Sequence, residues 1–360
     1  MDEDTSLPLG QQQARTRWGT HVSGAAFDRK KTPYLTEQAQ AFIAQQMFCV
    51  LAGLGPHHEP SGLLALGKPG FVQTLDRHTC LLQLDHRMGT SPLLRRLRQS
   101  LPAGGVAQLG LFFISHSTRE RLCVQGTAEL VPGDSPALVR LFAPPQQTLV
   151  GLHVRQAFFH CAKYIRTHIA GLTAPVAVSS EQPWQPQQLL GSGQHALTAA
   201  MQAFIREQVL CFLCTMNQEG QYAVNHRGGT PGFLLPLPPD EAAPGGTVVL
   251  PDYAGNGAFE AIGNILETGQ AALVIPNYAA QLAVCLSGSA RIVELGELAP
   301  ELVQRCRGAE RVVALSVRQV ETQSGDWSAA LGYERVRAET VKTTSNAAVT
   351  CLISSSLQKR

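Results

Sequence analysis

The sequence has almost no net charge and no long apolar run, and both absences limit the function. Its 360 residues contain 29 Lys and Arg against 27 Asp and Glu, so we expect no strongly basic face. Nucleic acid and an acidic membrane surface are therefore poor candidates for a partner. No apolar run reaches the roughly 20 residues that a membrane-spanning helix needs.

We also expect no secretion signal. Its first residues include Asp2, Glu3 and Asp4 and no apolar stretch, whereas a signal peptide needs such a stretch. Nine cysteines are present, and most lie in apolar, alternating runs, which is typical of reduced core thiols. We therefore expect a cytoplasmic protein.

Cys211 and Cys214 have the spacing of a metal-binding pair, but the rest of the sequence does not support a metal site. Both lie inside 209–215, an apolar run typical of a β-strand, so their side chains are expected on opposite faces. No second pair follows at zinc-site spacing. No Ser-His-Asp arrangement or carboxylate pair stands out either, so the sequence identifies no catalytic residue.

The most informative pattern is an internal repeat. Ten positions of the first half recur 162 residues later, from the pair Phe42 and Phe204 to the pair Ala128 and Ala290. A single offset over this length indicates a duplicated domain and not an array of short repeats.

Each copy has the same expected elements. A short amphipathic helix begins each copy, at 36–46 and 197–208, and a second helix interrupts each copy, at 92–99 and 257–267. The expected strands are 47–51, 71–75, 79–84, 107–114 and 121–130 in the first copy, and 209–215, 221–224, 233–235, 247–250, 271–275 and 282–293 in the second. Five or six strands with one helix predict a small antiparallel barrel per copy, so the fold class is mostly β (α+β).

The remaining segments flank or connect the copies. The expected division is an N-terminal arm at 1–36, a first barrel at 37–178, a linker at 179–196, a second barrel at 197–330 and a C-terminal tail at 331–360. Within the first barrel region, the last expected elements are a helix near 135–142, a strand near 149–157 and a segment at 158–169. The polar sequence of the arm does not indicate its purpose.

A polar cluster in the second copy is the strongest candidate for a ligand site. A strand ends at His226 and Arg227 and continues into a turn with Gly228, Gly229 and Thr230. Glycine lets a ligand approach the backbone closely, and arginine offers forked donors that suit phosphate. We therefore predict one wall of a phosphate-bearing cofactor site, with a surface salt bridge beside a turn as the alternative.

Several motifs occur together in this chain. They are Gly67–Phe71, Thr118–Leu122 before Gly126, Phe159–Ile165 with Ala162 where proline is usual, His226–Phe233, Pro251–Asn256 and Gly263–Ile265. As a set they resemble the pyridoxamine 5′-phosphate oxidase-like, FMN-binding split-barrel family, and more closely its tandem members. The resemblance covers residues 37–320. It implies two tandem split β-barrels that form an intramolecular pseudo-dimer.

The resemblance also implies an FMN between the two barrels, held by side chains on strands and loops. The repeat adds a constraint on where the cations lie. At the equivalent positions of the other copy, Arg227, Arg119 and Arg121 are replaced by Ala65, Gln281 and Ala283. Each copy keeps the cations that the other lacks, so we predict one composite site in which the second copy's arginine faces those of the first.

Other residues of these motifs have two interpretations each. Tyr253 and Asn256 suit either a cofactor contact or ordinary turn chemistry, and Asn264 suits either a cofactor contact or a helix C-cap. Arg119 and Arg121 are two apart on an expected strand and so share one face, which is either a solvated edge or a cofactor wall.

The expected function is an FMN-binding oxidoreductase, acting on a small molecule or on electrons from a reductase partner, as a monomeric pseudo-dimer or a homodimer. His160 and Lys163 are either cofactor contacts, as the resemblance implies, or buried hydrogen-bonded groups. One alternative is a haem-binding or haem-degrading split barrel with His160 or His226 as axial ligand. Another is a cofactor-free interaction protein, because 277–281 lacks the polar residues usual there.

The tail has its own pattern. Two stretches, 333–345 and 349–354, alternate as strands do. They resemble the opening of a ferredoxin-reductase-type FAD domain, and the alternative is a terminal hairpin that packs on the barrel.

Overall fold

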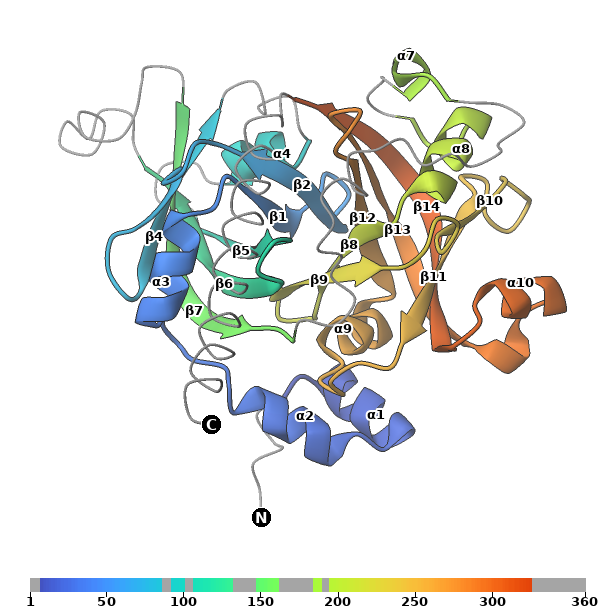
Figure 1. Cartoon of the computed structure of the whole chain (residues 1–360), viewed down its shortest axis with the longest axis horizontal. Coiled ribbons are helices and arrows are strands. Elements are labelled where there is room, and N and C mark those ends of the chain that lie inside the picture. The colour runs from blue at the N-terminus through green and yellow to red at the C-terminus, as the bar shows by residue number, and fades with distance from the viewer. Residues whose placement is uncertain are drawn as a thin grey trace, which may run out of the picture.

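A computed structural model describes residues 7–85, 92–100, 106–131, 147–161, 184–189 and 194–325. They form two seven-stranded antiparallel sheets that lie side by side (Figure 1). The first contains β1 (Phe48–Leu54), β2 (Pro60–Leu66), β3 (Val72–Thr74), β4 (Thr79–Asp85), β5 (Ala107–Ser115), β6 (Glu120–Leu130) and β7 (Gln147–Phe159). The second contains β8 (Leu210–Met216), β9 (Tyr222–Gly228), β10 (Leu235–Leu237), β11 (Thr247–Tyr253), β12 (Gln270–Asn277), β13 (Leu282–Glu294) and β14 (Ala309–Ser324).

The two sheets have the same topology, which confirms the tandem split-barrel fold. The first has the order β2-β1-β5-β6-β7-β4-β3, and the second, read from its other edge, has β9-β8-β12-β13-β14-β11-β10. Equivalent strands of the two copies therefore occupy equivalent positions in the two sheets. Even the local irregularity recurs, because a bulge follows Gln125 in β6 and Ser287 in β13. The chain is therefore a pseudo-dimer of two equivalent barrels.

Helices cover the barrel ends and edges. They are α1 (Leu9–Trp18), α2 (His21–Asp28), α3 (Glu37–Ala44), α4 (Pro92–Ser100), α7 (Pro186–Leu189), α8 (Ala199–Glu207), α9 (Glu260–Thr268) and α10 (Pro300–Arg305), with a short 3-10 turn at Leu295–Glu297. The helix that begins each copy is capped alike, because Thr36 accepts a hydrogen bond from Ala39 N and Thr198 accepts one from Met201 N. Among the described residues, no helix is both long and apolar enough to cross a bilayer.

Strand alternation divides the apolar side chains between two kinds of core. In β8, Cys211 and Leu213 enter the core of the second barrel, whereas Phe212 and Cys214 enter a third core between the barrels, which we call the seam. The prediction that the two thiols face opposite sides is therefore confirmed. The seam also holds aromatic residues from both barrels, with Phe112 and Phe212 rings 5.7 Å apart.

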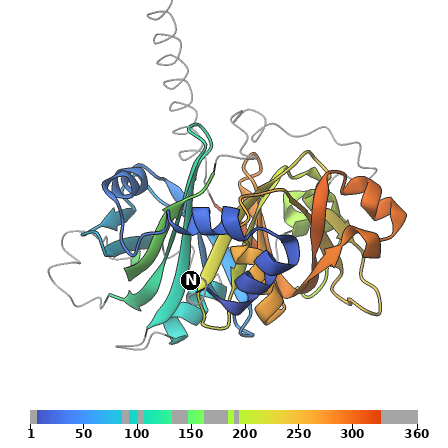
Figure 2. The same ribbon diagram turned by 90° about the horizontal axis from the view of Figure 1, so that it is seen from below.

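The N-terminal arm, for which the sequence indicated no purpose, joins the two barrels. Helix α1 packs on α9 of the second barrel, while Thr32 pairs with Ala157 of β7 in the first. Figure 2 shows α1 and α2 lying across the junction of the sheets. Arg15 is 1% exposed and forms an ion pair with Asp28 at 2.7 Å. The arm is thus an integral part of the structure.

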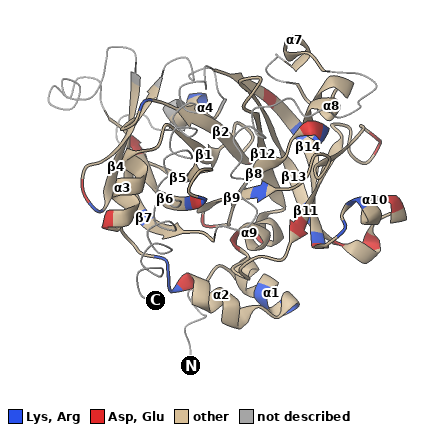
Figure 3. Ribbon diagram, in the orientation of Figure 1, with Lys and Arg blue, Asp and Glu red and all other residues tan. Residues whose placement is uncertain are grey.

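Two strands and the ends of two others differ from the expectations, and β10 begins at Leu235, two residues after its expected start. Strands β2 and β14 were not predicted, and β9 and β11 extend three to four residues beyond their expected ends, as far as Gly228 and Tyr253. The expected helix near 135–142, most of the segment 158–169 and the tail strands lie outside the described residues. Figure 3 shows Lys and Arg interspersed with Asp and Glu in the described part of the chain.

Candidate functional site

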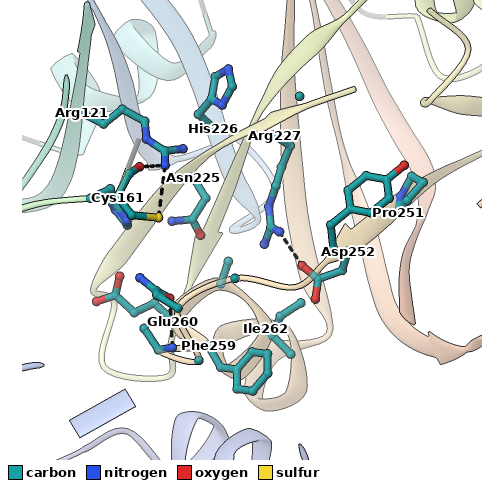
Figure 4. Close-up of a pocket in the computed structure, with 18 of the residues that line it drawn as sticks. Arg121, Cys161, Asn225, His226, Arg227, Pro251, Asp252, Phe259, Glu260 and Ile262 are labelled. Atoms are coloured by element: carbon teal, nitrogen blue, oxygen red, sulfur yellow. Dashed lines mark hydrogen bonds and ion pairs between the residues drawn. The ribbon is translucent and has the colours of Figure 1, made fainter. Parts of the chain in front are cut away.

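A pocket between the barrels brings together motifs from both copies (Figure 4). The second barrel provides Asn225–Gly228 of β9, Pro251–Tyr253 of β11 and the loop that leads into α9. The first barrel contributes Arg121 of β6 together with His160 and Cys161, which follow β7. The enclosed volume is about 110 Å³, below the roughly 300–1,000 Å³ of sites that enclose a whole drug-sized ligand.

Arg227 is held in this pocket by a buried carboxylate. Its Nη1 donates to Asp252 Oδ1, and Arg311 Nη1 of β14 donates to the other oxygen at 3.0 Å. Arg311 also donates to Glu310 at 2.6 Å. Two arginines on one carboxylate fix the direction of the Arg227 guanidinium, which is still 21% exposed. Figure 4 shows this guanidinium directed from β9 toward Asp252.

Arg121 approaches from the first barrel and is only 6% exposed. Its Nη2 donates to the Cys161 carbonyl and lies 3.7 Å from the Cys161 sulfur. Burial lowers the pKa of Arg121, and the charge of Arg227 lowers it further. The two cations are therefore close enough to repel each other, which a shared anion would relieve.

Both arginines keep a donor unused. Among the described residues, Nε of Arg121 and Nε of Arg227 are buried and have no hydrogen-bond partner. Leaving such a donor unpaired costs about 1–3 kcal/mol, and more when it is charged. Two orphaned guanidinium nitrogens that line one pocket fit a phosphate, whose oxygens accept charge-assisted hydrogen bonds.

The amino end of α9 forms another wall. Phe259 precedes the helix with a left-handed φ of 57° and provides no side-chain cap. The first N–H groups of a helix have no intrahelical acceptor and attract anions. Glu260 would oppose an anion there, but Lys31 of the arm binds its carboxylate at 2.6 Å. Burial tends to lower the pKa of Lys31, yet Glu260 and Asp28 outweigh it and the pKa is raised, so this ion pair stays charged.

His226 lines the pocket, but its ring points away from the Arg227 guanidinium. Adjacent residues of a strand face opposite sides, and the His226 ring lies in the seam, 5.9 Å from the Phe212 ring and 6.4 Å from the His116 ring. Figure 4 shows the ring directed away from the Arg227 guanidinium. Burial, with Arg121 and His116 nearby, holds its pKa well below the usual value, so the ring is neutral.

His160 is likewise a neutral, packed ring. Its Nε2 lies 3.0 Å from the Cys123 sulfur, and the rings of Phe27, Phe112 and Phe158 surround it at 5.0–6.0 Å. Burial lowers the pKa of His160 to about 3. It lines the pocket with its neighbour Cys161, but its side chain belongs mainly to the seam. Lys163 lies outside the described residues.

The glycine-rich turn is built for packing more than for ligand approach. A Cβ on Gly229 would lie 2.5 Å from the Phe233 Cβ, and Gly232 adopts a left-handed φ of 82°. Thr230 is exposed and does not line the pocket, whereas Gly228 does. The first copy repeats the same turn at Gly67 and Gly70 with Ala65 in place of Arg227, which supports a structural role.

Of the remaining expected site residues, two line the pocket and two do not. Tyr253 and Asn256 line it, and Asn256 also accepts a hydrogen bond from Ala258 N at 3.1 Å, as turn chemistry predicts. Asn264 lies inside α9 and donates to Thr215 Oγ1 at 3.1 Å, so it is neither a pocket residue nor a C-cap. Arg119 is exposed in the β5–β6 turn with φ 59° and not on a strand, so it does not share a face with Arg121.

Sequence reasoning missed the charged partners that hold the site. Asp252 stands within a motif that we had identified, but its contact with Arg227 and Arg311 depends on strand pairing across the second barrel. Lys31 and Glu260 are 229 positions apart, and nothing in the sequence pairs them. The one available signal was Asp252 itself, a carboxylate in an otherwise apolar strand.

Comparisons with known proteins give only distant similarity. No family model matches the sequence, and no curated protein matches it. Among solved structures, a candidate pyridoxamine 5′-phosphate oxidase from Lactobacillus delbrueckii is 19% identical over 36% of this chain and 98% of its own, with a TM-score of 0.29. HupZ from Group A Streptococcus is 18% identical over 36% and 94%, with a TM-score of 0.28.

A third structure, from Clostridium acetobutylicum, is related to general stress protein 26 of the pyridoxinephosphate oxidase family. It is 11% identical over 34% of this chain and 85% of its own, with a TM-score of 0.27. Each match thus covers about a third of the chain. At such low identities and scores, the fold assignment rests on strand order and register and not on these similarities.

Proposed function

We propose that the chain is an FMN-binding flavoprotein of the split-barrel type, with the FMN phosphate in the pocket between Arg121 and Arg227. The observation that supports this most strongly is the pair of buried guanidinium Nε atoms without partners, one from each barrel. The amino end of α9 adds backbone donors beside them. A phosphate dianion would offer acceptors to the guanidinium groups of both barrels and to these backbone donors.

The size of the pocket limits what it encloses. About 110 Å³ accommodates a phosphate group and its ester linkage, but not a fused three-ring system as well. The seam offers no further room, because side chains such as Phe112 and Phe158 fill it. The ring of a bound FMN would therefore have to extend through the open side of the pocket.

When bound, FMN supplies two-electron chemistry, and the chain's own residues bind and orient it. Asp252 and Arg311 hold the Arg227 guanidinium in place for the phosphate. The Cys161 carbonyl does the same for Arg121. The natural substrate is a small molecule or an electron-donating reductase.

The haem alternative has less support. Both candidate axial ligands, His160 and His226, are neutral as iron ligation requires, but each ring is packed against aromatic rings in the seam. The cofactor-free alternative is favoured by one observation, the small enclosed volume. A direct experiment separates the three possibilities.

The experiment is reconstitution of the purified chain, followed by absorption spectroscopy and titration. FMN is compared with riboflavin, which has the same ring and no phosphate, and with haem. We expect flavin bands, and FMN affinity at least about tenfold above that of riboflavin, because charge-assisted hydrogen bonds contribute about 1.5–3 kcal/mol each. Equal affinity for the two flavins, a Soret band, or no bound chromophore would contradict the proposal.

A further inference from the structure

A second pocket opens elsewhere on the junction of the barrels and shares no described residue with the first. The first barrel lines it with Leu54 at the end of β1, with Arg96 and Leu97 of α4, and with 106–108 at the start of β5. The second barrel lines it with Met216, Gly220 and Tyr222, around the turn between β8 and β9. Its enclosed volume, about 220 Å³, is twice that of the first pocket.

The lining is apolar except for a few groups, and one of them is the half-buried cation Arg96. Among the described residues, Arg96 Nε is buried and has no hydrogen-bond partner. Leu97 and Tyr222, which form part of the wall, are 4% and 3% exposed, whereas Val106 and Gln108 at the opening are exposed. Burial also raises the pKa of Tyr222, so its phenol stays protonated at neutral pH. None of the described lining residues is acidic.

These features together define the chemistry of a ligand. An apolar neutral molecule would leave the Arg96 donor unpaired, which is costly in a buried site. A phosphate dianion would bring two charges to a single cation among apolar walls. A carboxylate matches one guanidinium, because its two oxygens accept parallel N–H donors. The volume, below that of drug-sized sites, limits the remainder of the ligand to one ring or a short branched chain.

We propose that this pocket binds a small monocarboxylate with a compact apolar body, held by Arg96 at its carboxylate and by Leu54, Met216 and Tyr222 around its body. The site depends on both barrels, so its occupation stabilises their association by mass action. It is separate from the phosphate pocket, and its occupation does not require a bound flavin.

The test uses benzoate as the probe and benzamide, its uncharged analogue, as the control ligand. Binding is measured on the full chain by calorimetric titration and by the rise in melting temperature. The variants are Arg96→Met, which removes the cation and keeps an apolar side chain of similar length, and Arg95→Met on the same helix. Arg95 is exposed and does not line the pocket, so it controls for a general loss of positive charge.

We expect saturable benzoate binding to the wild type and to Arg95→Met, at least about tenfold weaker binding to Arg96→Met, and little binding of benzamide. If benzoate does not bind, if benzamide binds equally well, or if both variants lose binding alike, the proposal is wrong. If Arg96→Met does not fold, the benzoate affinity of the variant Val106→Trp tests the proposal instead. Val106 is 65% exposed at the rim, so a bulky side chain there obstructs the opening, and unchanged benzoate affinity would also overturn the proposal.

Discussion

Arg121 of the first barrel and Arg227 of the second line one pocket, although each stands on a strand whose counterpart in the other barrel has lost the cation. The counterparts are Ala283 of β13 and Ala65 of β2. A symmetric two-site dimer would carry both cations in both sites, whereas this chain places the cation pair on one side of its seam only. We therefore predict one anion site per chain.

On the other side of the seam, a side chain of β14 contacts the backbone of β2. Gln323 Nε2 donates to the Leu64 carbonyl at 2.5 Å, and its Oε1 accepts from Leu64 N at 3.0 Å. Leu64 is the counterpart of His226 in the repeat. The Gln323 side chain of β14 thus pairs with both backbone groups of Leu64 in β2, so neither group is left to bind a ligand.

Asp252→Asn is expected to destabilise the fold substantially. Arg311 is only 3% exposed, and the neutral amide removes the buried negative charge of Asp252 with which it pairs. Breaking a buried pair by removing one partner costs about 3–5 kcal/mol, and we expect about 3 because Glu310 remains. Urea unfolding at pH 7 measures the loss.

Arg227→Gln is the matched variant. It leaves the pair between Asp252 and Arg311 intact, so we expect a loss of only about 1 kcal/mol in the same urea experiment. Equal losses for the two variants would mean that Arg311 does not depend on Asp252, and the account of how Arg227 is oriented would then need revision.

Gly263→Ala is expected to loosen the N-terminal arm. A Cβ at this position would lie 2.5 Å from the backbone nitrogen of Gln11, so α1 must shift away from α9. Overpacking of this kind costs about 1–3 kcal/mol. Hydrogen exchange should show faster exchange in 9–28 than in the wild type. Gly296→Ala is the control, because nothing lies near its Cβ position, and exchange in 9–28 should not change in it.

Glu321 is expected to make stability fall as the pH rises. Burial raises its pKa from 4.5 to about 7, with Arg95 opposing the shift and Glu59 adding to it. The folded state therefore binds more protons than the unfolded state between pH 4.5 and 7, and stability decreases through this window by at most about 3 kcal/mol.

The variant Glu321→Gln isolates this effect from the buried histidines. His116 and His160, with pKa values lowered by burial to about 4 and about 3, act in the opposite direction, since their stabilising contribution is lost as the pH falls below 6.5. We expect the variant to gain stability relative to the wild type between pH 5 and pH 8, measured by urea unfolding at each pH. A difference independent of pH would contradict the raised pKa.

Much of the fold could be predicted because the repeat supplied the same information twice. Strand β2, missed in the first copy, is the counterpart of 222–228, where part of a strand was predicted. Applying the repeat in that direction would have identified it. Strand β14 is the counterpart of β7, which was predicted, and the same reasoning applies.

The site was harder to predict because it depends on which way side chains point and on contacts between distant segments. Strand alternation, which we used for Cys211 and Cys214, also separates His226 from Arg227 and would have placed them on opposite faces. The ion pair between Lys31 and Glu260 had no such signal, because it arises from the packing of the arm on α9. The position of Arg119 is set by turn geometry, because its left-handed φ places it in the turn before β6 and not on the strand.

The most direct test of the central claim is a titration of FMN into the wild type, Arg121→Gln, Arg227→Gln and the double variant, with Arg119→Gln as control. We predict one FMN per chain, a loss of at least about tenfold in affinity for each single variant at Arg121 and Arg227, and a wild-type affinity for Arg119→Gln, because that side chain is exposed outside the pocket. Two FMN per chain, or an affinity that survives the loss of either pocket arginine, would contradict a single phosphate site shared by the two barrels.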